Sequence, residues 1–460
     1  KINFMEIYKK QSLSESFSIY FEKRMAKIIL LGIISGFPWV LIGSGLSLWL
    51  KEDGLSRSTI GWAGLIFSVY AFNYLWAPVV DRIRIPWLTD KIGHRRAWIV
   101  SMQLIILISL ISWSLINPTT NLSLVIAVGL IIAIASATQD ITIDALRIEQ
   151  IGPNEGKSMQ AGAAMAVVGW WTGYKLGGVT ALNLAEYFEQ AGFENYWQIT
   201  FLILGTVIIA CSIGLMFIHE TSSDQRKDSQ KQIDQIIIKK LGSSSIGAKS
   251  VAWISATIAG PVMSFFKQNG FKIALGILAF VFLFKIGEAF LGRMSIIFYK
   301  EMGFSKSDIA LYSKGLGWIT TVVFTLLGGL FAIRSGVIKA MFLSGVLMAL
   351  TNILFSILAW SGKSEWLFAV AVIFDDMAAA FATVSFVAFI SLLVDRTYTA
   401  TQYALLASIG TAGRTMMASS SGALVDWLNG DWGIFFVLTA VMVIPSLIFL
   451  WLIKDKLNLK

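Results

Sequence analysis

KEDGLSRSTI at Lys51–Ile60 and KEMGFSKSDI at Lys300–Ile309 are two copies of one polar stretch, far apart in the chain. Six of the ten positions are identical, and two more exchange Leu for Phe and Arg for Lys. Each copy follows a long apolar run, at 28–50 and at 272–298. Similarity at such a separation is typical of an internal duplication. The sequence therefore predicts two related halves, each with an apolar segment that ends in this polar loop.

The rest of the chain consists largely of apolar runs long enough to cross a membrane. Residues of the types AVILMFWYC make up 56% of the 460 residues, and charged residues make up 14%, whereas about a quarter of the residues in soluble domains are charged. A spanning helix needs about 20 apolar residues. Twelve runs have about this length, at 28–50, 58–80, 97–116, 122–146, 158–183, 198–218, 272–298, 307–332, 339–361, 366–394, 402–428 and 433–453. We therefore expect an all-α integral membrane protein with twelve transmembrane helices, six in each half.

Positively charged residues indicate which loops face the cytoplasm. If the first residues lie inside, the cytoplasmic segments and the span ends beside them hold 27 of the 37 Lys and Arg residues, and the external loops hold 5. Cytoplasmic loops of membrane proteins are enriched in Lys and Arg. This distribution also accounts for the net charge of +9 without a nucleic-acid partner. We expect both chain ends to be cytoplasmic.

The connection at 219–271 is much longer than the others and divides the chain in two. Its apolar stretch Val251–Phe266 is short for a span and contains Pro261, so we interpret it as an interfacial helix. The expected organisation is an N-terminal cytoplasmic or interfacial segment at 1–27, a six-helix bundle at 28–218, a cytoplasmic linker with interfacial amphipathic helices at 219–271, a six-helix bundle at 272–453 and a cytoplasmic tail at 454–460.

Two parallel six-helix repeats joined by a cytoplasmic linker describe the major facilitator architecture, in which the two repeats enclose a central cavity. A second similarity between the halves supports it, because Gln160 opens the fifth run and Gln402 opens the eleventh, each after a short polar loop. The alternative is a chance similarity of two external loops. The predicted fold is the major facilitator fold.

Two aspartates interrupt the apolar run at 122–146, in the stretch QDITID from Gln139 to Asp144. An ionised carboxylate at that depth is costly and usually functional. Asp140 and Asp144 are four residues apart and therefore lie on one helix face, where we expect them to share a water-accessible cavity. Burial disfavours the charged form of a carboxyl and a nearby cation favours it, so such a pair can take up and release protons. A structural ion pair with Lys175 or Arg414 is the alternative.

Other charged and aromatic side chains within the runs complete the predicted site. Asp375 and Asp376 are adjacent and point about 100° apart on a helix, so we expect one of them, Asp376, to face the cavity. Cations in the fifth, seventh and eleventh runs can bind the carboxylates of an anionic substrate or neutralise the buried acids, and residues three apart on one face can pair with each other. The proton-coupling candidates are Asp140, Asp144 and Asp376, and the substrate-binding candidates are Gln139, Lys175, Tyr174, Trp171, Trp39, Lys285, Glu288, Lys314, Asp375, Gln402 and Arg414.

The first cytoplasmic hairpin carries an acidic and then a basic pair of residues. Asp81 and Arg82 close the second run, and Arg95 and Arg96 open the third. Asp81 can accept charge-assisted hydrogen bonds from these arginines or from the opposite half. We expect a latch that holds the cytoplasmic gate shut in one state. Anchoring by the positive-inside rule alone is the other interpretation of the arginines.

Six blocks of the sequence, in order over both halves, resemble the AmpG-type muropeptide permeases, a family within the major facilitator superfamily. They are GIISGFPWVLIGSGLSLWL at Gly32–Leu50, LWAPVVDR at Leu75–Arg82, SATQDITIDA at Ser136–Ala145, GYKLG at Gly173–Gly177, LFKIGEAF at Leu283–Phe290 and TATQYALLASIGTAGR at Thr399–Arg414. The resemblance implies a proton-driven secondary transporter in a bacterial inner membrane. Its substrates would be anhydro-muropeptides, cell-wall fragments made of amino sugars and a short peptide, imported from the periplasm to the cytoplasm. The bilayer and protons are the other expected partners, and a monomer is the expected state.

Other functional classes fit the sequence less well. A related transporter for acetyl-coenzyme A or another anionic metabolite remains the alternative, since phosphates also favour buried cations. We do not expect an enzyme, because the chain has no G-x-S-x-G elbow, phosphate loop or zinc-binding His pair. Its one cysteine, Cys211, offers no metal cluster, and we expect no cofactor. A channel would need a fixed selectivity filter, whereas two rocking repeats suit stepwise carriage.

Overall fold

The computed structural model describes residues 13–55, 63–220, 259–304, 317–418 and 420–457, and a few linker positions at 228, 231–232 and 235–236. Within these ranges the regular structure is helical and no strand occurs. Each of the twelve predicted runs coincides with helix over the part that is described. The predicted all-α fold is therefore confirmed.

The first half contains six spanning segments, two of which are broken into shorter helices. They are α2 (Lys23–Gly36) with η2 (Val40–Gly45) and α3 (Leu46–Glu52); η3 (Gly64–Ser68), α5 (Val69–Phe72), η4 (Asn73–Leu75) and α6 (Ala77–Arg82); α8 (His94–Ser114); α9 (Leu122–Glu149); α10 (Gly156–Gln190); and α11 (Tyr196–Leu215). Short helices precede and connect them: α1 (Leu13–Ser18), η1 (Ile19–Phe21) and α7 (Leu88–Ile92).

The second half repeats this order of six segments. They are α14 (Phe271–Leu283) with α15 (Ile286–Glu301); α17 (Gly317–Ser335); α18 (Val337–Ser361); α19 (Glu365–Leu393); α20 (Thr399–Ala418) with α21 (Ser421–Trp427); and α22 (Trp432–Val441) with α23 (Ile444–Ile453). A short turn, η6 (Arg396–Tyr398), precedes α20. Residues 259–269, at the end of the linker, are also helical. Most of the predicted interfacial helices at 219–271 lie outside the described residues, so that prediction is not tested.

Nine of the described helices are long and apolar enough to cross a membrane. The segments that do not reach this hydropathy or length are the second, the fifth and the eleventh. α10, the fifth, packs on α17 and α19 of the other half, and α20, in the eleventh, packs on α6 and α9. Helices that meet the other half need fewer apolar side chains than helices surrounded by lipid, because part of their surface faces protein or a cavity.

The two copies of the polar loop make the same contact in each half. Glu52, at the end of α3, accepts a hydrogen bond of 2.5 Å from Nε1 of Trp197, at the start of α11. Glu301, at the end of α15, accepts one of 2.6 Å from Nε1 of Trp432, at the start of α22. The glycine two residues further has a φ of 83° in the first half and 85° in the second, a backbone conformation that favours glycine. In both halves the repeated sequence therefore ties the first span to the sixth.

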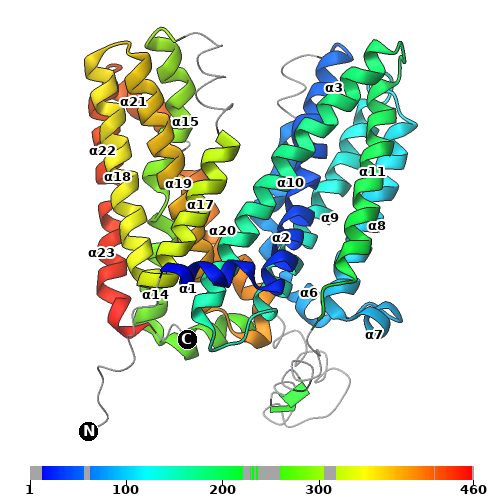
Figure 1. Cartoon of the computed structure of the whole chain (residues 1–460), viewed down its shortest axis with the longest axis horizontal. Coiled ribbons are helices and arrows are strands. Elements are labelled where there is room, and N and C mark those ends of the chain that lie inside the picture. Colours follow the sequence, from blue (N-terminus) through cyan, green and yellow to red (C-terminus); the bar gives the residue numbers. More distant parts are fainter. Residues whose placement is uncertain are drawn as a thin grey trace.

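The halves meet at one end and separate at the other. Figure 1 shows the ribbons of the two bundles converging near α1, α6 and α20, and diverging toward α3 and α15. At the converging end one apolar core joins both halves, with Met25 and Met165 from the first and Phe280 and Phe389 from the second. At the diverging end each half has its own core. The converging end carries α1, α7 and the end of α23, which the charge distribution predicts to be cytoplasmic. The molecule is closed at this end, which is called the cytoplasmic end below.

The N-terminal segment also bridges the halves at this closed end. The Tyr20 hydroxyl donates a hydrogen bond of 2.8 Å to the carbonyl oxygen of Leu326 in α17. Four residues further, Arg24 pairs with Glu155 at 2.5 Å and donates to Ser158 Oγ at 2.9 Å. Both of these partners lie at the start of α10. The first residues that the structure describes therefore connect α17 to the first half.

Candidate functional site

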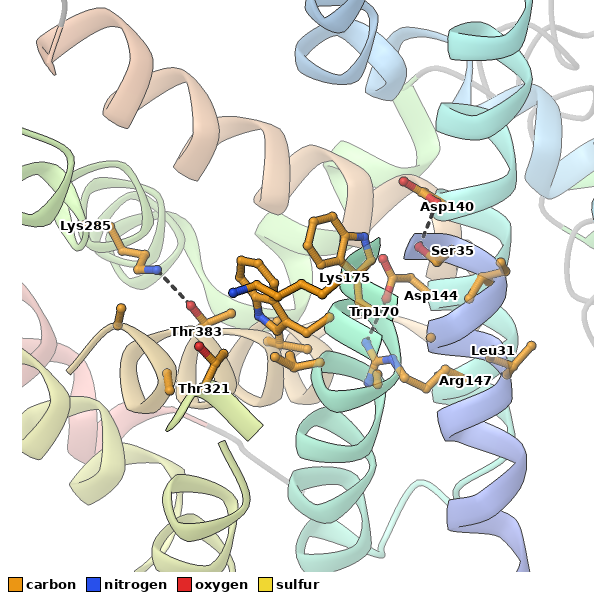
Figure 2. Close-up of a pocket in the computed structure, with 18 of the residues that line it drawn as sticks. Leu31, Ser35, Asp140, Asp144, Arg147, Trp170, Lys175, Lys285, Thr321 and Thr383 are labelled. Atoms are coloured by element: carbon orange, nitrogen blue, oxygen red, sulfur yellow. Dashed lines mark hydrogen bonds and ion pairs between the residues drawn. The ribbon is translucent and has the colours of Figure 1, made fainter. Parts of the chain in front are cut away.

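A cavity of about 670 Å³ lies between the two halves. Residues of α2, α9 and α10 line it from the first half, and residues of α15, α17, α19 and α20 line it from the second. Figure 2 shows Lys285 on one side of this pocket and the two aspartates of α9 on the other, with Lys175 and Trp170 between them. The position agrees with the predicted central cavity.

Asp140 and Asp144 both line the cavity, as the i and i+4 spacing predicted. Ser35 of α2 donates a hydrogen bond of 2.7 Å from Oγ to Asp140 Oδ1. Asp144 Oδ1 lies 3.2 Å from Nη2 of Arg147, one turn further along α9. Among the described residues, neither acid forms an ion pair with Lys175 or Arg414. Asp144 therefore forms an ion pair, as the alternative interpretation predicted, but the cation is Arg147 and not Lys175 or Arg414.

Two cations line the cavity from the second half. Lys285 occupies the break between α14 and α15, and its Nζ lies 3.1 Å from Glu288 Oε2 and 2.9 Å from Thr383 Oγ1. Arg414, from α20, donates from Nη2 to Thr411 Oγ1 at 3.2 Å. The predicted i, i+3 pair of Lys285 and Glu288 forms, and both of its members also line the cavity.

Lys175 and Asp376 bring opposite charges to the cavity from the two halves. They are close enough to interact electrostatically. Lys175 Nζ lies 5.1 Å from the centre of the Trp171 ring, within the range of a cation–π contact. Asp376 accepts a hydrogen bond of 3.0 Å from Thr320 Oγ1. Asp376 lines the cavity and Asp375 is not among its lining residues, which agrees with the expectation that one of the two faces it.

The predicted latch residue Asp81 connects the halves at the cytoplasmic end. Its side chain is 1% exposed, and Oδ1 accepts a hydrogen bond of 2.7 Å from Arg95 Nη2. Its Oδ2 accepts bonds of 2.8 Å from the Thr401 N–H and 2.6 Å from the Thr401 hydroxyl, at the start of α20. Arg95 also pairs with Glu149 at 2.9 Å. A carboxylate at a helix N-terminus satisfies free N–H groups and the helix dipole, so Asp81 stabilises the closed arrangement.

The other gate candidates lie around this contact. The N–H groups of Arg95 and Arg96 donate to the carboxylate of Glu220, at 2.9–3.2 Å, and Arg96 Nη1 donates to the Met216 carbonyl at 3.4 Å. Arg82 is half-buried at the end of α6. Across the halves, Arg396 Nη1 donates to the carbonyl oxygen of Ile148 at 2.6 Å. Arg96 therefore holds the first half together, whereas Asp81 and Arg396 cross between the halves.

Comparison with known proteins agrees with this architecture. A family profile described as the Major Facilitator Superfamily matches residues 28–319. The putative transporter AmpG 4 of Rickettsia conorii is 31% identical, over 96% of this chain and 99% of that protein. The chain belongs to the AmpG family of the Major Facilitator Superfamily. The anhydromuropeptide permease of Escherichia coli K12 is 27% identical to this AmpG-family chain, over 97% of it and 82% of the permease.

The fold of this AmpG-family protein is also found among solved structures. The proton:xylose symporter XylE, bound to 6-bromo-6-deoxy-D-glucose, has a TM-score of 0.63 at 14% identity, with 96% of both chains covered. The human organic anion transporter MFSD10 has a TM-score of 0.55, also at 14% identity. At this identity the likeness shows the fold alone. With the family, it confirms a multi-pass membrane transporter with twelve spanning helices, and not an enzyme.

Five of the predicted substrate residues of the AmpG-family chain do not line the cavity: Gln139, Gln402, Asp375, Trp39 and Tyr174. Gln139 is buried and donates to the Ile34 carbonyl at 2.9 Å. Gln402 is buried at the cytoplasmic end and donates to the Pro261 carbonyl at 2.9 Å. Both predictions were wrong in placement, because a residue next to a cavity-facing one points about 100° away. Asp375 and Trp39 are likewise absent from the lining residues, and Lys314 lies outside the described residues.

Aromatic side chains of α10 form one wall of the cavity. Trp170 and Trp171 line it. Tyr174 does not, but its ring stacks on Trp170 with centres 5.4 Å apart, and Trp39 meets the same ring edge-on at 5.7 Å. The two predicted residues Tyr174 and Trp39 therefore support Trp170 from behind. Trp171 is placed as predicted.

The sequence reasoning missed Arg147 as a site residue. Arg147 directly follows the fourth apolar run at 122–146, so the apolar pattern alone places it in the next loop. In the structure it is buried in the last turn of α9 and lines the cavity. Its position three residues after Asp144 was the available signal, since residues at i and i+3 are neighbours on a helix.

Proposed function

We propose that this protein imports anhydro-muropeptides from the periplasm to the cytoplasm by proton symport, with alternating access, in a bacterial inner membrane. One observation carries the proposal: a single cavity between the halves is lined by carboxylates and cations from both halves and by the indole rings of α10. The family supports the same substrate class, since one relative is named an anhydromuropeptide permease. The ligand would be an anionic sugar peptide.

Each part of such a ligand has a matching group in the cavity. Carboxylates of the peptide would bind Lys285 and Arg414, because charge-assisted hydrogen bonds are stronger than neutral ones. Sugar rings would pack on the indole faces of Trp170 and Trp171. Lys175 Nζ lies 5.1 Å from the centre of the Trp171 ring, and this cation would be able to meet either part of the ligand. The ligand would therefore connect the two halves when it binds.

The aspartates would supply the coupling to protons. An ionised carboxylate in a cavity that closes and dries is costly, so a bound proton lowers the barrier to closure around the ligand. Asp140 is held by the neutral hydroxyl of Ser35 and not by a cation, which leaves its charge uncompensated when water leaves. One proton moving down 100 mV contributes about 2.3 kcal/mol, enough for roughly fifty-fold accumulation of a substrate.

Gradient-driven uptake tests the proposal directly. Purified protein in liposomes, with labelled anhydro-muropeptide outside and a proton gradient directed inward, is expected to accumulate the label up to about fifty-fold per 100 mV. A protonophore should abolish accumulation. Asp140→Asn and Asp144→Asn are each expected to reduce it to simple equilibration, because neither side chain can carry a proton on and off.

Asp90→Asn is the matched control for these variants. Asp90 lies in the cytoplasmic hairpin with a side chain that is 79% exposed, and its removal should leave accumulation unchanged. Full accumulation in both cavity variants would exclude the proton role. Accumulation of acetyl-coenzyme A, but not of the muropeptide, would instead favour the related transporter for an anionic metabolite.

Removal of one cation from the cavity should weaken binding of an anionic ligand. Arg414→Gln and the double variant Lys285→Gln/Glu288→Gln are expected to lower affinity about 10- to 100-fold, because a hydrogen bond to a charged group contributes about 1.5–3 kcal/mol. The double variant avoids an unpaired Glu288, whose partner is Lys285. Calorimetric titration with the muropeptide and with its carboxyl-amidated analogue measures the effect. Equal losses for both ligands would contradict a carboxylate contact.

A further inference from the structure

Arg147 connects the cavity to the cytoplasmic gate. Its side chain is 0% exposed, and Nη2 lies both 3.2 Å from Asp144 Oδ1 and 3.0 Å from Ser391 Oγ in α19. Its guanidinium also lies 5.5 Å from the centre of the Tyr403 ring in α20. One residue of α9 therefore contacts a cavity acid and two helices of the second half, α19 and α20.

Asp140 has different neighbours, although it lies only one turn away and lines the same cavity. It accepts its hydrogen bond from Ser35 in α2, within the first half. Its electrostatic partners Asp144 and Tyr70 belong to the first half as well. A change in the charge of Asp140 therefore reaches the second half only through Asp144, whereas a change at Asp144 acts directly on Arg147, which contacts both halves.

The surroundings of Arg147 make its charge depend on Asp144. Asp144 is the carboxylate that pairs with it among the described residues. Arg396, from η6, carries a like charge that Arg147 feels, and Glu149 is engaged by Arg95. Nε and Nη1 of Arg147 are buried with no hydrogen-bond partner among the described residues. Removal of the negative charge of Asp144 would leave a buried cation that is paired with neutral groups only.

We propose that Asp144 and Arg147 transmit the charge state of the cavity to the cytoplasmic gate, and that Asp140 does not. With Asp144 ionised, Arg147 is neutralised and remains in the closed contact with Ser391 and Tyr403. With Asp144 protonated, the buried guanidinium lacks a counter-charge, and opening of the cytoplasmic end gives it water. A buried pair that loses one partner is strongly destabilised, and here that cost falls on the closed state.

This inference rests on the proposed proton role of the acids, but its test needs no substrate. Spin labels on Asn154→Cys and Lys339→Cys, in a Cys211→Ser background, report the distance between the halves at the cytoplasmic end. Asn154 and Lys339 are both exposed, and they lie before α10 and near the start of α18. Pulsed electron paramagnetic resonance in nanodiscs measures the closed and open populations at high and low pH.

Asp144→Asn is expected to shift the open-to-closed ratio by roughly tenfold or more toward the open state at every pH, since an amide cannot neutralise Arg147. Asp140→Asn is the matched control and should keep the closed distance of the wild type at high pH. The double variant Asp144→Asn/Arg147→Gln should return to the closed distance, because the unpaired cation is gone. A melting temperature equal to that of the wild type in each variant would exclude unfolding as the cause.

Two results would overturn the inference: equal shifts for the two single variants, or a double variant that stays as open as Asp144→Asn. The outcome is separable from that of the proposed function. If the protein takes up no muropeptide but Asp144→Asn opens its cytoplasmic end, the proposed substrate is excluded, and the proposed connection of Asp144 and Arg147 to the gate stands. If the protein accumulates muropeptide but Asp144→Asn leaves the distance at the cytoplasmic end unchanged, the proposed substrate stands, and the proposed connection to the gate is excluded.

Discussion

Gly36→Val is expected to leave no folded, active transporter in the membrane. A Cβ at this position would overlap the backbone carbonyl of Trp170 in α10, and neighbouring Gly32 meets the backbone of Ala166 and Gly169 in the same way. Close contacts of this kind are typical of glycine-lined helix pairs in membranes. Overpacking against side chains that can move costs about 1–3 kcal/mol, and a backbone carbonyl cannot move aside. The helices α2 and α10 would have to separate, and Trp170 would leave the cavity wall.

The yield of monodisperse protein on size-exclusion chromatography, followed by uptake, measures this effect. Gly178→Ala is the matched control on α10, because a Cβ there has nothing within 4 Å. It should give normal yield and normal transport. A Gly36→Val protein with wild-type yield and uptake would show that α2 and α10 do not pack as described.

Asp81→Ala is expected to lower uptake by at least about 100-fold, because removal of one partner from a buried charge pair costs about 3–5 kcal/mol. Among the described residues, the variant leaves the Arg95 guanidinium, which is 0% exposed, with Glu149 as its remaining carboxylate partner. It also removes the carboxylate that accepts from the N–H and hydroxyl of Thr401. The cytoplasmic end would then close poorly, and the cycle would stall with the cavity open inward.

Initial rates of uptake in liposomes, together with the distance between labels at Asn154 and Lys339, test this expectation. Asp90→Asn again provides the comparison, since it removes an exposed carboxylate from the same hairpin. An Asp81→Ala protein with normal rates and a closed cytoplasmic distance would exclude the latch. The pair of readouts separates a gating defect from a loss of binding, because binding of the muropeptide should be retained.

Several site residues could be predicted from the sequence because their placement depends on one helix only. Asp140 and Asp144 face the cavity together, as a spacing of four residues requires. The same periodicity separates Asp376 from Asp375. Predictions that depended on the rotation of a helix were less successful. Gln139 precedes Asp140 in the sequence, yet it turns toward α2 and donates to the Ile34 carbonyl.

The sequence by itself determined the membrane class, the twelve spans and the duplication, because apolar length and repeated loop residues are properties of local stretches. Only the tertiary structure decided which side chains meet between the halves. Arg147 and Ser391 are 244 residues apart, and Asp81 and Thr401 are 320 apart. Contacts at such separations depend on how two preformed bundles dock against each other, and no periodicity within either helix encodes that geometry.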